Sequence, residues 1–278
     1  MKSALAFLFT QCIVLGSVLA QDNSETNSSV AKQPHGKFYF FWGYNRDAYT
    51  RSTIHFVNTQ TDDYDFTFDN AEARDQPDYE NFYDIEKLTI PQYNLHLGYF
   101  FNDRKNLGVE ISWDHLKYIV KDYQNIYVHG QIREHQIDKD TLVVPSFVHL
   151  QHTNGNNYLM VNLLKKFSLS SHKNFEIGLV GKVGAGPLVS YTISEILGNK
   201  DLGYFHYHGF VTGLGVDLRI DLSRYFFIQT GVQGAFVNYT NTRLGADHVG
   251  KATHTFYSYQ FIYGIGFTIP WNKKDKNE

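Results

Sequence analysis

The stretch that decides the fold, Tyr225–Tyr239, reads YFFIQTGVQGAFVNY. Alternate positions from Phe226 to Phe236 are mostly aliphatic or aromatic, whereas the positions between them include Gln229, Gly231 and Gln233. Successive side chains of a β-strand point to opposite faces of the sheet. This stretch therefore predicts a strand with one apolar face and one face of polar and small residues.

The same alternation recurs throughout the chain. With the opening stretch it marks eight segments, at 38–45, 93–101, 107–114, 158–166, 175–184, 210–220, 225–239 and 257–267. Charged residues and glycine share the less apolar face of these segments, and six of the charged positions are Glu110, Asp114, Glu176, Lys182, Asp217 and Arg219. The face that carries glycine, and so has the least side-chain bulk, is therefore also the charged face.

This pairing of charge with glycine indicates which face lies inside. The interior of an eight-stranded barrel is only wide enough to be filled by side chains. Glycine leaves room there, and residues of opposite charge are present to pair. We therefore predict an all-β, up-and-down antiparallel transmembrane barrel of about eight strands, whose six charged residues form a polar network in the lumen and whose apolar face meets lipid. A secreted β-sandwich is the alternative.

The connectors alternate in length, which predicts a meander with two different rims. Short polar turns stand at 102–106, 168–174 and 221–225, and long connectors at 50–90, 122–153, 191–205 and 241–252. In outer-membrane barrels the short turns face the periplasm and the long loops face outside. Within the first long connector, IHFVN and YDFTF flank TQTDD and predict an outer hairpin that prolongs the barrel wall.

The ends of the chain predict export. Residues 1–20 follow the basic, apolar, small-residue order of a secretory signal peptide, so we expect export through the Sec pathway and cleavage after Ala20. The expected divisions are a polar segment at 21–35, the barrel at 36–271 and a charged tail at 272–278. Cys12 is the only cysteine, so the mature chain has no thiol, and its 24 basic and 28 acidic residues argue against nucleic acid as a partner.

The whole pattern resembles the small eight-stranded outer-membrane barrels of Gram-negative bacteria, the OmpA/OmpX-type class. The resemblance covers Gly36 to about Trp271 and rests on architecture, without a residue-level motif. It implies an outer-membrane location, with the lipid bilayer and lipopolysaccharide as partners. One departure is the C-terminus, where such chains often finish on an aromatic residue, whereas here FTIPW is followed by NKKDKNE.

Some barrels of this class are lipid-modifying enzymes, and the lipid A deacylase pattern is a His and a Ser two positions apart on one strand face. Such spacing lets the imidazole help to activate the hydroxyl. No His here is followed two positions later by Ser or Thr. The stretch most similar to this pattern is HLQHTNGNNY, in which His152 and Asn154 should share a face and Thr153 should point the other way. His152 is therefore the catalytic candidate if the chain is an enzyme.

Five histidines, His115, His152, His206, His208 and His254, are expected near the outer ends of strands. His206 and His208 are two apart and form a candidate metal pair, since paired imidazoles suit a transition metal. The alternative is that all five are rim residues bonded to neighbours and water. No cofactor is predicted. The acidic, aromatic connector at 50–90 and the connector at 122–153 are candidate surfaces for an extracellular ligand.

These observations favour a non-enzymatic outer-membrane scaffold that presents extracellular loops for surface interaction or envelope integrity. A lipid A deacylase or acyltransferase is the second hypothesis, and a small porin is the third. A filled lumen would argue against the porin.

Overall fold

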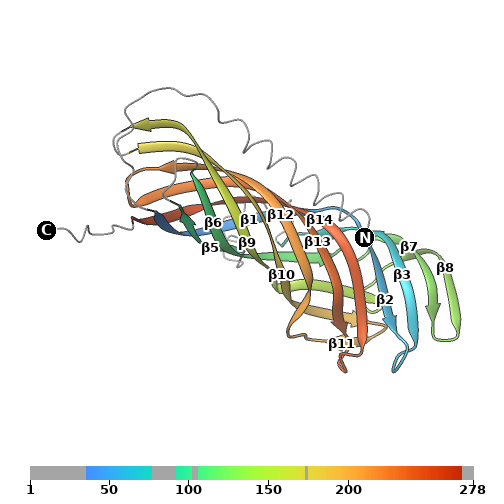
Figure 1. Ribbon diagram of the computed structural model, residues 1–278. Helices are drawn as coiled ribbons and strands as arrows, with labels where there is room; N and C mark the ends of the chain where they lie inside the picture. The colour runs from blue at the N-terminus through green and yellow to red at the C-terminus, as the bar shows by residue number, and fades with distance from the viewer. Residues whose placement is uncertain (1–35, 77–91, 102–105, 173–174, 271–278) are drawn as a thin grey trace.

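Eight antiparallel strands close into a ring in the computed structural model, which describes residues 36–76, 92–101, 106–172 and 175–270 (Figure 1). The ring consists of β1 (Lys37–Tyr49), β5 (Tyr93–Phe100), β6 (Leu107–Val120), β9 (Val148–His172), β10 (Phe175–Ile196), β12 (Phe205–Asp221), β13 (Phe226–Leu244) and β14 (Gly250–Pro270). Each strand pairs with the next, and β14 pairs with β1 from Lys37↔Pro270 to Tyr49↔Ser258. The predicted eight-stranded barrel is confirmed. Residues 1–35 and 271–278, and with them the predicted signal peptide and tail, lie outside the described residues.

The two faces of the ring differ as the strand chemistry requires. Glu110, Asp217 and Arg219 are almost fully buried inside the ring. Their neighbours in sequence, such as Val216 and Ile111, are 47% and 64% exposed on the outside. An apolar outer band around a closed sheet is what a bilayer accommodates, because every backbone group in hydrocarbon needs a partner within the protein. No helix among the described residues is long and apolar enough to cross a membrane.

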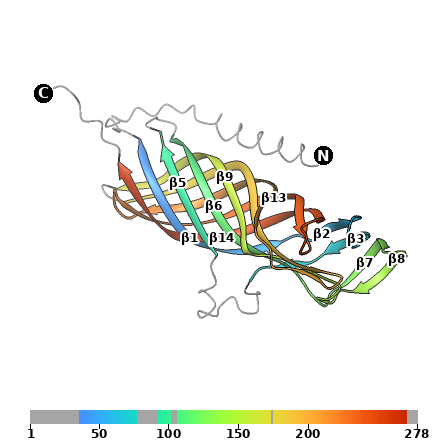
Figure 2. The same cartoon turned by 90° about the horizontal axis from the view of Figure 1, so that it is seen from below.

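A second set of strands extends the sheet beyond the ring. β2 (Ser52–Asn58) pairs with the outer end of β14, and β3 (Tyr64–Ala71), β7 (Asn125–Ile132) and β8 (His135–Leu142) follow in order. These four strands, called the outer sheet below, project from one end of the barrel, opposite the end where β1 begins and β14 finishes (Figures 1 and 2). Two short strands complete the fold, β4 (Ala73–Arg74) on β6 and β11 (Asn199–Asp201) on β10.

Two hydrophobic clusters lie inside the molecule. The larger joins the inner face of the outer sheet, with Phe56, Phe66 and Phe68, to Leu150 and Tyr118 on the outer ends of β9 and β6. A smaller cluster around Tyr39, Phe41 and Phe227 lies nearer the other end of the barrel. The charged lumen residues lie among the ring strands, and the apolar core beneath the outer sheet closes the barrel on one side of them.

The strands run further than the sequence pattern indicates. The connectors expected at 191–205 and 241–252 are largely strand, since β10 continues to Ile196 and β13 to Leu244. The connectors at 50–90 and 122–153 hold β2, β3, β4, β7, β8 and the start of β9. The physical reason is that the interior turns apolar at this end, so the alternation of charge and glycine that marks the membrane segments ends there. The hairpin expected from IHFVN and YDFTF is β2 with β3.

The apolar band predicts a depth-dependent response to charge. Val232 lies on the outer face of β13 and is 60% exposed. The substitution Val232→Arg should lower the free energy of unfolding by about 2–4 kcal/mol, because the guanidinium enters hydrocarbon. Thr255→Arg is the matched control, since Thr255 is exposed on β14 beyond the apolar residues and should cost about 0–1 kcal/mol. Denaturant unfolding of both variants in lipid vesicles measures the difference. Equal destabilisation would contradict the assignment of the outer band.

Candidate functional site

The centre of the lumen is built around His96, a fully buried histidine on β5. Its Nε2 lies 2.8 Å from Asp114 Oδ1, and its Nδ1 lies 3.4 Å from Glu110 Oε2. Each nitrogen of an imidazolium is a donor, and an ionised carboxylate only accepts. With a carboxylate at each side of the ring, the doubly protonated form places an N–H toward each of them, as a hydrogen bond at Nε2 and a longer ion-pair contact at Nδ1. His96 therefore acts as a buried cation between two acids from β6.

Other polar side chains also donate hydrogen bonds to these acids. Asn94 Nδ2 donates to Asp114 Oδ1 at 2.7 Å, and Asn162 Nδ2 donates to Glu110 Oε1 at 3.0 Å. Tyr39 donates its hydroxyl hydrogen to Glu110 as well. A buried carboxylate is tolerated only when it is paired and hydrogen-bonded, and both conditions are met here.

The other predicted lumen residues form two further groups. Lys182 Nζ lies 3.3 Å from Asp217 Oδ2, which also accepts from Gln229. The guanidinium of Arg219 lies 3.4 Å from the ring centroid of Phe227 and donates to Thr268 at 2.8 Å. Glu176 is placed differently, half-buried near the strand end, where it pairs with Lys166 at 2.9 Å.

Hydrogen bonds cross the lumen between strands that are not neighbours in the sheet. Gln233 on β13 donates to Asp114 on β6 at 3.2 Å, and Tyr158 on β9 donates to Ser258 on β14 at 3.2 Å. Tyr239 on β13 donates to Asn156 on β9 at 2.8 Å. Side chains that meet across the axis fill the interior, so these contacts form a plug.

His152, His208 and His254 lie together inside the barrel, beyond the charged network. The His152 ring stacks on Tyr239 with centroids 4.3 Å apart, and its centroid lies 5.9 Å from that of His208 and 6.0 Å from that of His254. Each ring is held from one side: His152 Nδ1 meets Thr192 Oγ1 at 2.8 Å, and His208 Nε2 donates to the Ser190 carbonyl at 3.0 Å. His254 Nδ1 lies 3.5 Å from Ser52 Oγ. The cluster packs as part of the core.

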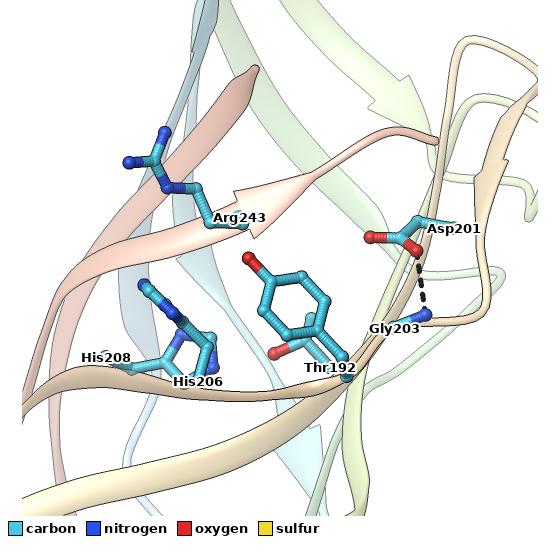
Figure 3. Close-up of a pocket in the computed structure, with 7 residues that line it drawn as sticks. Thr192, Asp201, Gly203, His206, His208 and Arg243 are labelled. Atoms are coloured by element: carbon cyan, nitrogen blue, oxygen red, sulfur yellow. Dashed lines mark hydrogen bonds between the residues drawn. The ribbon is translucent and has the colours of Figure 1, made fainter. Parts of the chain in front are cut away.

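His206 lies nearer the surface, where the strand pairing between β12 and β13 has ended (Figure 3). That ladder runs only as far as Gly209↔Tyr239, and beyond it side chains bridge the two strands: Asn241 Nδ2 meets His206 Nε2 at 3.2 Å, and Thr240 donates to the His208 carbonyl. The His206 and His208 rings are perpendicular, 5.3 Å apart. Across the described ranges, no three His, Cys, Asp or Glu side chains are grouped to hold a metal ion.

The expectation that His152 and Asn154 share a face is wrong. His152 is fully buried and Asn154 is exposed, while Thr153, expected to point away, is also buried. The cause is an irregularity in β9, where Gly155 has φ +143° and the register against β6 and β10 shifts. A bulge adds a residue to one strand and breaks the alternation. His115 lies outside the cluster of His152, His208 and His254, and its ring stacks on Tyr93 with centroids 4.6 Å apart.

The outer sheet presents a polar face that carries several Asp and His side chains. His55 Nε2 lies 2.7 Å from Asp65 Oδ1, and His129 Nδ1 lies 3.5 Å from Asp69 Oδ2. Tyr127 donates to Asp138 on the same face. All three contacts come from the connectors singled out as candidate ligand surfaces, so the structure gathers residues of both connectors, 50–90 and 122–153, on one surface.

Glu72 ties the segment after β3 to the end of β6. Lys121 Nζ lies 3.2 Å from Glu72 Oε2, and Arg51 donates to the other carboxylate oxygen. The hydrogen bond from Lys121, followed by the two positive charges, lowers the pKa of Glu72 below its ordinary value. Because such a carboxyl group stabilises the fold in its ionised form, this contribution is present at neutral pH and is lost as pH falls through the lowered pKa.

His96 is the residue that sequence reasoning left out of the lumen network. The alternation of the segment at 93–101 places it on the face of Asn94 and Gly98, so the signal was present. Its role depends on β5 lying against β6, which brings Glu110 and Asp114 beside it. The short turn predicted at 102–106 makes the two strands neighbours, but alternation does not give the register that brings these three side chains together.

No family model matches the chain, and no curated protein matches it. Solved structures do. The outer-membrane protease OmpT from Escherichia coli matches with 11% identity and a TM-score of 0.38, covering 88% of this chain and 100% of that one. OprG from Pseudomonas aeruginosa matches with 11% identity and a TM-score of 0.35, covering 86% and 98%. Ail, the attachment invasion locus protein of Yersinia pestis, matches with 9% identity and a TM-score of 0.32, covering 84% and 99%.

At these identities and TM-scores the likeness concerns the fold alone. The class of the fold follows from the chain's own geometry, a closed antiparallel ring with a polar interior and an apolar exterior. It is the fold of the small outer-membrane β-barrels.

Because the His96 imidazole lies between two buried carboxylates, we expect removal of its charge to lower the stability of the barrel strongly. His96→Gln should lower the free energy of unfolding by about 3–5 kcal/mol, because two buried carboxylates lose their cation. His55→Gln removes a histidine from an exposed pair with Asp65 and should cost about 0–1 kcal/mol. Denaturant unfolding in vesicles compares the two variants. A His96→Gln barrel as stable as the His55→Gln control would show that His96 carries no needed charge.

Proposed function

We propose that the chain is an integral outer-membrane protein of non-enzymatic type, a plugged barrel that carries the outer sheet on the cell surface for interaction or envelope integrity. The observation that supports this most is the combination of an apolar outer band with a lumen crossed by hydrogen bonds from Gln233, Tyr158 and Tyr239. A barrel of this kind anchors a structure in the membrane and leaves no path for solute.

The outer sheet is the proposed binding surface. Along β2 and β3 its inner face is committed to the core through Phe56, Phe66 and Phe68, so there its polar face is the one available for contact. β8 is largely exposed on both faces. Charged and aromatic side chains on that face, such as Asp69 and Tyr127, suit a polar extracellular ligand, and the lipopolysaccharide around the barrel is the proposed lipid partner. Export by the Sec pathway with cleavage after Ala20 belongs to the same proposal.

The geometry gives the enzyme hypothesis little support. His152 is fully buried beneath Tyr239 and its Nδ1 contacts Thr192, so no substrate can reach it in this arrangement. The comparison that separates the hypotheses is of envelope lipids from deletion and wild-type cells by mass spectrometry. An acyl chain altered by deletion and restored by the wild-type gene, but not by a His152→Ala gene, would replace the scaffold proposal with lipid A deacylase or acyltransferase activity.

The membrane assignment predicts the behaviour of the isolated protein. The protein should require detergent for extraction from the outer-membrane fraction and should migrate faster on a gel before boiling than after, because the closed sheet resists detergent. Planar bilayers should show no steady conductance, because the plug fills the lumen. Recovery as a soluble periplasmic protein would contradict the membrane location, and a stable open channel would contradict the plug.

A further inference from the structure

One side of the barrel carries an apolar surface that continues beyond the outer band. It is formed where β10 and β12 approach β11, and we call it the apolar spur. Leu202, Phe205 and Tyr207 are 79%, 57% and 55% exposed there. Val189 pairs with Tyr207, and Tyr191 pairs with Phe205, whose ring it meets edge-on at 5.3 Å. Four of these side chains thus lie on paired outward positions of β10 and β12, and the exposed Leu202 precedes Phe205 by three residues.

Neighbouring strands turn polar before this level is reached. On β13 the outward side chains change from Phe236 to Asn238, and on β14 they change from Tyr257 to Thr255, which pairs with Asn238. On β12, Phe210 pairs with Asn238, and the outward face beyond it continues with Tyr207 and Phe205. The spur therefore stands above the edge of the apolar band that β13 and β14 define.

The row of outward apolar side chains on β10, called the apolar stripe here, also extends beyond the outer band. Its outward positions are apolar or glycine from Phe175 to Ile193, and the first charged one is Glu195. At about 3.3 Å per residue and a tilt of about 45°, this stripe rises roughly 42 Å along the barrel axis, against about 25 Å for the usual outer band. Glu195 pairs with Lys200 on β11, so the stripe ends at a charged tip.

We propose that the apolar spur is immersed in the outer leaflet of the membrane, so that the barrel sits tilted or the bilayer thickens on the β10–β12 side. The occupant is lipid because the spur is continuous with the lipid-facing band through Phe210 and Leu214, and its five side chains carry no charge. A hydrophobic surface taller than the bilayer is accommodated by tilting or by local thickening. Tyr and Phe at the upper edge fit the aromatic girdle of such barrels.

The inference rests on the proposed membrane location, and the experiment tests the two separately. The mature chain has no cysteine, because Cys12 lies in the expected signal peptide, so single cysteines can carry a nitroxide spin label. The three variants are Phe205→Cys on the spur, Val232→Cys in the band and Thr255→Cys just above the band. Each labelled barrel is placed in dioleoylphosphatidylcholine vesicles, and label collisions with oxygen and with a water-soluble nickel chelate are compared.

We expect the label at 205 to match that at 232, with collisions dominated by oxygen, and the label at 255 to be reached several-fold more readily by the nickel chelate. A label at 205 that behaves like the one at 255, while 232 remains in hydrocarbon, would overturn the spur proposal and leave the barrel in the membrane. Protection from both reagents with dipolar broadening at 205 would assign the spur to a second copy and also overturn it. Nickel access at 232 would reject the membrane location itself.

Discussion

The structure depends on a single constraint, that a sheet in hydrocarbon must satisfy its own backbone. An open sheet has two edges of unpaired N–H and C=O groups, and lipid offers them no partner. Pairing of β14 with β1 along Lys37–Tyr49 removes both edges within the ring. Closure then divides the side chains into two populations, because a strand sends alternate residues to the axis and to the lipid. The positions of Glu110 inside and Ile111 outside follow from that division.

Closure creates a second requirement, since a narrow lumen must bury whatever polar groups face it. Three acids, Glu110, Asp114 and Asp217, lie there with Lys182, Arg219 and His96. The two β6 acids are balanced only if His96 is a cation, and its contacts at both ring nitrogens provide for that. A buried ion pair contributes little net stability compared with apolar packing. In this barrel the buried ion pairs fill the lumen, while the outer faces of the same strands are apolar and face lipid.

Within the membrane segments, much of this could be predicted from the sequence. Alternation predicts the ring, its strand count and the inward position of Asp217. A regular strand with lumen on one side and lipid on the other alternates polar and apolar residues, and this pattern is visible in the sequence. Three features could not be predicted. The β9 irregularity at Gly155 breaks the parity that placed His152 beside Asn154. The charge of His96 depends on the register of β5 against β6, which alternation does not give. Beneath the outer sheet the interior is apolar, so alternation no longer separates strand from loop, and the last residues of β10 (191–196) and β13 (241–244) fall in predicted connectors.

The change of interior from charged to apolar also explains how the two ends of the molecule differ. In the membrane the outside must be apolar, so polar side chains are confined to the lumen, where they pair with one another. Above the membrane the outside meets water, and the barrel can reverse the arrangement, with Phe66 and Phe68 inside and Asp65 and Asp69 outside. The apolar spur is the exception to that reversal, because β10 and β12 keep an apolar exterior beyond the level at which β13 and β14 become polar. An asymmetric exterior on an otherwise closed ring gives the barrel a defined orientation in the leaflet.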